Sequence, residues 1–242
     1  MLRAEPQLSR LKGATNELIP DLAIHVDSES SIWTEPSTAN IDRLYTSLRL
    51  QHPEAGTRYW RSRGWGLLIW QPIYLAVIAT HKCQLTLPLN EMGQNFPVSG
   101  IPSGILFRRG QFKLGEINDC VKGTAEDLMR GCQQLHTCWS ESGLTRKCAD
   151  RMVADCVLSA LLMVYPQQAE EAETFGHLWL TTMGLQSAAG FIRYKNHAGE
   201  ARLALLKRGC CFRYLCHGCS PCAICPRQTE DERLMRLRLA GP

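Results

Sequence analysis

The feature that most constrains this chain is a dense run of cysteines near its C-terminal end. Six of the 12 cysteines lie in one segment, CCFRYLCHGCSPCAIC, which runs from Cys210 to Cys225 and is followed by Pro226. In a reducing compartment, a cluster of thiols this dense holds a metal or does redox work more often than it forms disulfides. We therefore expect a loop-like metal or iron–sulfur site in this segment.

The compartment is predicted from the N-terminal residues and from the most apolar run. The start, MLRAEPQLSRLKG, lacks the apolar core of a secretory signal, so we expect a cytoplasmic protein. The run over 64–80 falls short of the ~18 apolar residues that span a bilayer, and Gln71-Pro72 interrupts it. We expect a buried core segment there. Peripheral membrane contact through its tryptophans is the alternative and is not expected.

Charge and composition narrow the class of partner. With 242 residues, of which 45% are hydrophobic, the chain is long enough for one substantial domain or two small ones. Its net charge of +4 is far from the concentrated positive charge typical of nucleic-acid binding. We expect no nucleic-acid partner, whereas an anionic small ligand fits this charge.

The spacing of apolar residues predicts a mostly helical body with few strands. The first thirty residues show little periodicity, and Leu85, Leu87 and Leu89 indicate short strands. Two hairpins are expected, one pairing 105–107 with 112–114 and one pairing 191–195 with 201–206. Helices are expected over about 41–51, 58–80 (continuous or broken at Pro72), 125–139, 145–164, 168–183 and 229–239.

These elements together predict an α+β fold: a mostly helical body with short antiparallel strands or hairpins and a C-terminal cysteine-rich iron–sulfur segment. The predicted division places a helical α+β body at 1–206 and the cluster-binding segment at 207–242.

Three kinds of site fit the cysteine spacing. A mononuclear zinc site would use the Cys216–Cys219 and Cys222–Cys225 pairs, although these lie closer together than in a standard zinc ribbon. A 4Fe-4S cluster would use the same four thiols, but its usual last gap is three residues and this chain has two. A 2Fe-2S cluster would use the vicinal pair Cys210 and Cys211 with Cys222 and Cys225. Adjacent strand residues point to opposite faces, so the backbone must leave the strand at that pair, and Gly209 would allow this.

The pattern Cys-Cys-x10-Cys-x2-Cys at 210, 211, 222 and 225 resembles the C-terminal signature of siderophore ferric reductases of the FhuF type. The likeness extends to a helical body of about this length with the cysteines at its C-terminal end. The resemblance implies an α+β fold, a 2Fe-2S cofactor bound by these four cysteines, and one-electron reduction of siderophore-bound iron(III). Cys216 and Cys219, inside the ten-residue gap, depart from the family pattern and are candidate substitutes for a ligand.

The resemblance also implies partners, namely a ferric siderophore and an electron donor. Neither a phosphate-binding glycine loop nor a dinucleotide fingerprint occurs, so the donor is expected to be a protein or a reduced nicotinamide or flavin without a recognisable site. The alternative function is a zinc-binding module, or an iron–sulfur electron carrier with no substrate of its own.

Cations near aromatic residues are the candidate substrate site. Arg58, Arg61 and Arg63 are interleaved with Tyr59, Trp60 and Trp65, and they would bind an anionic ferric siderophore by charge and stacking. The other interpretation is a solvated helical face beside core aromatics. Lys207 and Arg208, just before the cysteines, would raise a cluster's potential and attract an acidic partner. His217 is expected to lie beside the site rather than to bind metal.

Overall fold

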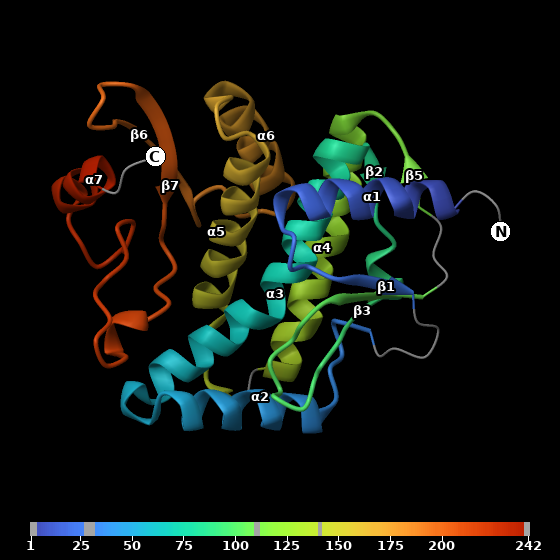
Figure 1. Ribbon diagram of the computed structural model, residues 1–242, viewed down its shortest axis with the longest axis horizontal. Helices are drawn as coiled ribbons and strands as arrows, with labels where there is room; N and C mark the ends of the chain where they lie inside the picture. Colours follow the sequence, from blue (N-terminus) through green and yellow to red (C-terminus); the bar gives the residue numbers. More distant parts are fainter. Residues whose placement is uncertain (1–3, 27–31, 109–111, 140–141, 240–242) are drawn as a thin grey trace.

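The structure is a computed structural model that describes residues 4–26, 32–108, 112–139 and 142–239. Helices dominate, and the strands are short and mostly antiparallel, which confirms the predicted α+β fold class. The longest helix, α3 (Gly56–Cys83), lies at the centre and packs against α1, α2, α4 and α5 (Figure 1). Among the described residues, no helix is both long enough and apolar enough to cross a membrane.

The central helix α3 is continuous through Pro72, so of the two predicted alternatives the single helix is observed. Proline removes one helical hydrogen bond, which usually breaks or kinks a helix. Here almost every side chain from Leu67 to Thr80 is buried, so tertiary packing on all sides stabilises the helix across that point. The helix ends at Gln84, whose left-handed backbone lets its N–H cap the last carbonyls.

Helix α1 (Ala4–Leu18) lies in the region where the sequence indicated little periodicity, and it packs on α3. Its buried face is narrow: Leu11 and Thr15 are almost fully enclosed, and most of the remaining side chains whose exposure is described are polar and at least partly exposed. Because so few apolar residues form this stripe among many polar ones, the sequence shows no clear helical periodicity here.

The predicted hairpin between 105–107 and 112–114 is wrong. Strand β4 (Ile105–Phe107) lies between β1 (Ile24–Val26), to which it is parallel, and β3 (Met92–Gln94), to which it is antiparallel. Strand β5 (Lys113–Leu114) pairs instead with β2 (Leu85–Thr86). Ile105 and Phe107 are fully buried, and pairing on both edges satisfies the backbone there. Most of the expected turn, 109–111, lies outside the described residues.

Three other helices follow the prediction closely. Helix α2 (Thr38–Gln51) is capped by Ser37 and ends before His52, as the predicted range 41–51 implies for its C-terminal end. Helix α5 (Arg146–Val164) buries an apolar stripe, and α6 (Ala169–Thr182) is followed by Gly184 with φ +69°, a left-handed conformation typical of a helix C-terminus. Helix α4 (Ile117–Trp139) begins earlier than the expected residue 125.

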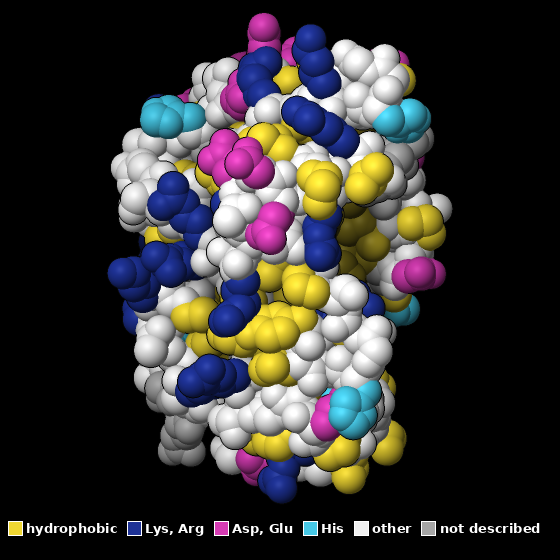
Figure 2. Space-filling model, turned by 90° about the vertical axis from the view of Figure 1, so that its left-hand side faces the viewer, with side chains coloured by type: hydrophobic (Ala, Val, Ile, Leu, Met, Phe, Trp, Pro, Cys, Tyr) yellow, Lys and Arg dark blue, Asp and Glu magenta, His cyan; other side chains and the backbone are white. Residues whose placement is uncertain are grey.

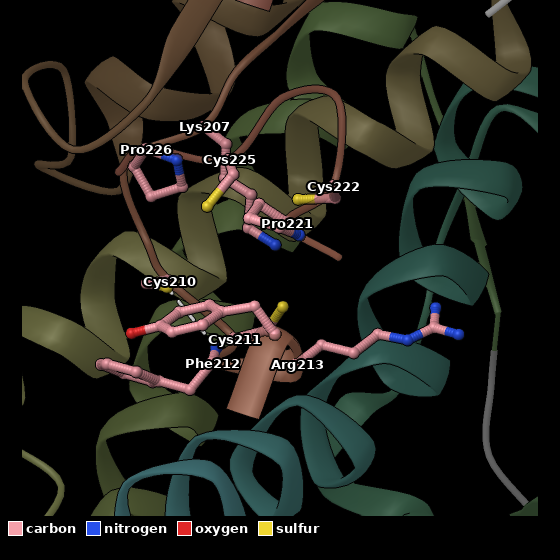
Figure 3. A pocket seen from close by; sticks show the side chains of 10 residues that line it. Lys207, Cys210, Cys211, Phe212, Arg213, Pro221, Cys222, Cys225 and Pro226 are labelled. Carbon is pink, nitrogen blue, oxygen red and sulfur yellow. Dashed lines mark hydrogen bonds between the residues drawn. The ribbon is translucent and has the colours of Figure 1, made fainter. Parts of the chain in front are cut away.

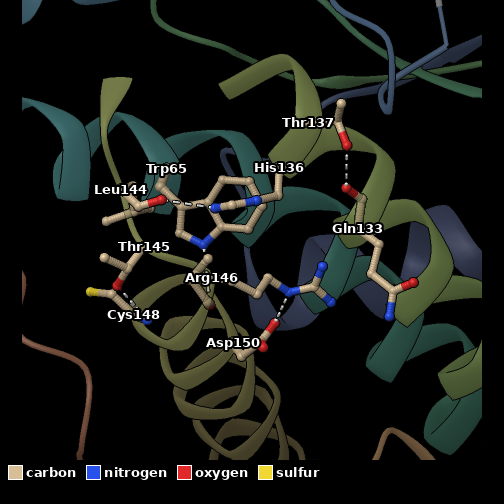
Figure 4. A network of polar contacts seen from close by, with 10 residues as sticks. Trp65, Gln133, His136, Thr137, Leu144, Thr145, Arg146, Cys148 and Asp150 are labelled. Carbon is tan, nitrogen blue, oxygen red and sulfur yellow. Dashed lines mark hydrogen bonds and ion pairs between the residues drawn. The ribbon is translucent and has the colours of Figure 1, made fainter. Parts of the chain in front are cut away.

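A polar network fixes the junction between α4 and α5 (Figure 4). His136 Nε2 lies 2.9 Å from the carbonyl oxygen of Leu144, and the side chain of Thr145 caps α5 by accepting from the Cys148 N–H. The indole N–H of Trp65 donates to the Ala149 carbonyl across from α3. These contacts set where α5 begins and therefore how it faces the cysteine segment.

The C-terminal hairpin is confirmed. Strands β6 (Gly190–Lys195) and β7 (Ala201–Leu206) pair in antiparallel register, and the Asn196 side chain accepts from two backbone N–H groups in the turn. The hairpin packs on α5, and the predicted terminal helix is present as α7 (Glu230–Leu239) beside β6. The cysteine segment begins where β7 ends. The division of the chain at residue 207 stays a prediction.

Candidate metal centre

A buried carboxylate on α5 anchors the start of the cysteine segment. Asp155, only 4% exposed, accepts hydrogen bonds from the backbone N–H of Arg208 at 3.1 Å and of Gly209 at 2.8 Å. Burial raises the pKa of Asp155 to about 6, although both hydrogen bonds and the nearby Lys207 lower it. The chain leaving β7 is thus tied to α5 immediately before the vicinal cysteines.

Gly209 is required here for space. It does not have the left-handed backbone that glycine uniquely tolerates. A Cβ at this position would lie 2.8 Å from Cγ of Met152 and 2.9 Å from Oδ2 of Asp155. The close approach of the loop to α5 therefore excludes a side chain. The left-handed residue is Phe212, with φ 54°, directly after the two cysteines.

Four of the six cysteine side chains line one small surface pocket (Figure 3). The thiol of Cys210 interacts with that of Cys225, and the thiol of Cys211 interacts with that of Cys222. Each pair joins one cysteine of the vicinal pair to one of the later pair. The pocket thus has two thiol pairs, contributed by the two halves of the loop.

The second half of the loop is a tight turn. The Cys225 N–H donates to the Cys222 carbonyl at 2.9 Å, and this turn brings both side chains to the same pocket. Arg236 of α7 donates to the Pro221 carbonyl at 2.8 Å and fixes the loop from the C-terminal side. The terminal helix is therefore tied directly to this turn of the cysteine segment.

The electrostatics of the pocket favour one thiolate. The hydrogen bond from Cys222 lowers the pKa of Cys211, and the positive charge of Lys207 adds to this effect. Burial raises the pKa of Cys210. Lys207 and Arg213 both line the pocket, so cations stand where thiolate charge would gather.

The structure separates Cys216 and Cys219 from the other four cysteines. Cys216 is 4% exposed and packs in a small cluster with Ala55 and Tyr59, whose hydroxyl is hydrogen-bonded to its sulfur. The thiol of Cys219 interacts with the guanidinium of Arg213. Neither lines the pocket between the two thiol pairs.

Two of the three predicted substrate arginines point toward different regions of the protein. Arg61 donates to the Gly143 carbonyl at 2.7 Å, toward the α4–α5 junction, whereas Arg63 lies near Tyr59 on the side of the cysteine segment. Arg58 and Arg63 are exposed.

The aromatic residues expected to stack on a substrate are engaged in packing. Tyr59 and Trp65 are 5% and 1% exposed. Trp60 contacts Tyr45 edge to face, and its indole N–H donates to the His52 carbonyl. The enclosed rings of Tyr59 and Trp65 therefore cannot stack on a substrate in this arrangement, and a role for the arginines stays a prediction that rests mainly on charge.

Two features of the site escaped the sequence analysis. Asp155 interrupts the apolar stripe of α5, and a single acid among buried aliphatic residues was a usable signal of a buried polar role. The backbone N–H of His217 donates to Glu54 at 3.0 Å, and the side chains of His52, Glu54 and Cys216 meet at the edge of the cysteine segment. Because 163 residues separate His217 from Glu54, no local pattern could have indicated that meeting.

No family model matches the chain, and no solved structure matches it.

Proposed function

We propose that this protein is a siderophore ferric reductase, which reduces siderophore-bound iron(III) to iron(II) by one electron through a 2Fe-2S cluster. The cluster would be bound by Cys210, Cys211, Cys222 and Cys225. The observation that carries the proposal is the convergence of these four thiols, as two pairs, on one pocket at the protein surface.

Pairing of the thiols favours a dinuclear site over a mononuclear one. In a 2Fe-2S cluster bound by four cysteines, two thiolates bind each iron, so two close pairs facing one another suit it. A single zinc ion instead needs all four donors around one point. Among the residues that the structure describes, the only three potential ligands found within 4.8 Å of one another are His52, Glu54 and Cys216, and the four pocket thiols form no such group.

For this chemistry the protein needs mainly to bind the cluster and to leave it accessible to the substrate and the electron donor. A 2Fe-2S cluster supplies one electron at a time, and reduction weakens the bonds between iron and the hard oxygen donors of a siderophore, so reduction releases the metal. The residues of this chain would hold the cluster at the surface, set its potential with Lys207, and attract an anionic substrate or acidic donor.

The surface around the segment supports this role. On the face that carries the cysteines, Lys and Arg side chains border an apolar surface (Figure 2). Arg213 lines the pocket, and Arg227 lies over the ring of Tyr214, which also lines the pocket, at 5.1 Å. In this proposal the protein works in the cytoplasm, where iron(II) is used, and it takes electrons from a partner protein or from a reduced nicotinamide or flavin.

The test is anaerobic purification followed by absorption and EPR spectroscopy. We expect a 2Fe-2S signal after reduction, and its reoxidation when a ferric siderophore is added. A colourless, zinc-loaded protein would contradict the cluster. A 2Fe-2S signal that no ferric siderophore reoxidises would leave an electron carrier without its own substrate.

Replacement of single cysteines tests the ligand assignment. Serine at position 210, 211, 222 or 225 should abolish the cluster, because each change removes a thiolate from one of the two pairs. Cys219→Ser is the matched control, since Cys219 belongs to the same loop but interacts with Arg213 outside the pocket. Loss of the cluster in Cys219→Ser would overturn the assignment.

A further inference from the structure

We infer that His52, Glu54 and Cys216 form a second metal site, separate from the thiol pocket, which binds one divalent ion of the Zn²⁺ or Fe²⁺ class. One potential ligand atom from each of the three side chains lies within 4.8 Å of the other two. This inference does not rest on the proposed function, because none of the three residues lines the pocket of the thiol pairs.

The spacing of the donors is close to that of a coordination sphere. Ligand atoms at ~2.0–2.3 Å from a tetrahedral zinc ion are separated from one another by about 3.4–3.8 Å. Nδ1 of His52 and Oε1 of Glu54 are 3.6 Å apart. The Cys216 sulfur lies within 4.8 Å of a ligand atom of both residues, so side-chain rotations would bring the three donors to coordination distances.

The donor set identifies the class of ion. An imidazole nitrogen, a carboxylate oxygen and a thiolate sulfur together suit a borderline divalent ion, whereas Mg²⁺ and Ca²⁺ prefer oxygen donors alone. The side chain of Cys216 is enclosed, but those of His52 and Glu54 are 37% and 20% exposed. Three protein ligands with one side open to solvent leave a coordination position for water or an exchangeable ligand.

Neighbouring groups hold the ligands in place. Glu54 accepts a hydrogen bond from the His217 N–H at 3.0 Å, which orients its carboxylate toward the cysteine segment. The Tyr59 hydroxyl is hydrogen-bonded to the sulfur of Cys216, and the ring of His52 meets that of Tyr59 edge to face at 5.4 Å. Hydrogen bonds and ring contacts of this kind fix the orientation of metal ligands and tune their basicity.

The position of the site gives it a structural consequence. His52 and Glu54 flank Pro53 in the short 3-10 helix η1 (Pro53–Ala55) and its N-cap, between α2 and α3. Cys216 follows the 3-10 helix η4 (Arg213–Leu215) of the cysteine segment. A bound ion would therefore join the helical body to the loop that carries the vicinal cysteines. Cys216 would then be a ligand of this ion, although it is not part of the thiol pocket.

The test is zinc binding to the full-length protein, measured by equilibrium dialysis and by X-ray absorption at the zinc edge. We expect one bound ion with a single sulfur ligand and the remaining ligands nitrogen or oxygen. His52→Ala, Glu54→Gln and Cys216→Ser should each weaken its binding by on the order of 10-fold or more, because each removes a ligand. Cys219→Ser is the control and should leave affinity unchanged.

The readouts separate this site from the thiol pocket. Zinc in the pocket would show mainly sulfur ligands and would not respond to His52→Ala, so the ligand set and the response to His52→Ala distinguish the two sites. Far-UV circular dichroism checks that each variant is folded, and Glu54→Gln preserves side-chain shape. Zinc binding that is absent, or equal in all three variants and the control, would overturn the inference.

Discussion

The hydrogen bonds between Asp155 and the cysteine segment allow a quantitative prediction of how much their loss destabilises the attachment of that segment. Asp155→Ala removes the acceptor of two backbone N–H groups, those of Arg208 and Gly209. Gly209 is buried, so its N–H would be left without this partner, at a cost of ~1–3 kcal/mol. Arg208 is exposed and its N–H can reach water, so that lost bond costs about 1 kcal/mol. Together they destabilise the attachment by about 2–4 kcal/mol.

Asp155→Asn should be milder. The amide oxygen can still accept from one of the two N–H groups, while its NH₂ group cannot accept from the other. The substitution also removes the cost of burying a carboxylate, which is the cause of the raised pKa of Asp155. We therefore expect a loss of about 1–2 kcal/mol, between wild type and Asp155→Ala.

The assay is hydrogen–deuterium exchange of the peptide that contains residues 206–212. Exchange through local opening should be about 30- to 700-fold faster in Asp155→Ala, since every 1.4 kcal/mol is tenfold. The matched control is Asp150→Ala on the same helix, where Asp150 forms a partly exposed ion pair with Arg146 worth at most about 1 kcal/mol. Exchange in Asp155→Ala that is no faster than in the control would refute the anchoring function.

Two further predictions concern the helical body. Burial lowers the pKa of His81 to about 4, and the Trp179 indole N–H donates to its Nε2, so the neutral ring is favoured in the folded state. Stability should therefore fall as the pH drops from about 6.5 to about 4, by on the order of 3 kcal/mol, and His81→Gln should remove this part of the dependence in urea titrations. Gly176→Ala would place a Cβ 2.6 Å from Cε2 of Phe191 and should cost about 1–3 kcal/mol in urea denaturation. Gly13→Ala, with nothing within 4 Å, should stabilise instead, and an equal effect of the two glycine changes would contradict this packing.

Local patterns determined much of the body. The helices α2, α5 and α6 and the β6–β7 hairpin each depend on residues close together in the sequence, and all appear close to their predicted ranges. Strand pairing, in contrast, was not determined by residues close together in the sequence. β4 pairs with β1 across about 80 residues, because burial of Ile105 and Phe107 requires partners on both edges, and no turn sequence encodes that choice.

The same distinction between local sequence and tertiary structure holds for the cysteine segment. The sequence by itself determined which thiols are available and the spacing that singles out Cys210, Cys211, Cys222 and Cys225. Only the tertiary structure decided that these four converge as two pairs on one pocket while Cys216 turns toward His52 and Glu54. The reason is physical: side-chain direction in a loop depends on what holds the backbone, and here the holding groups are Asp155 on α5, Arg236 on α7 and Glu54 before α3.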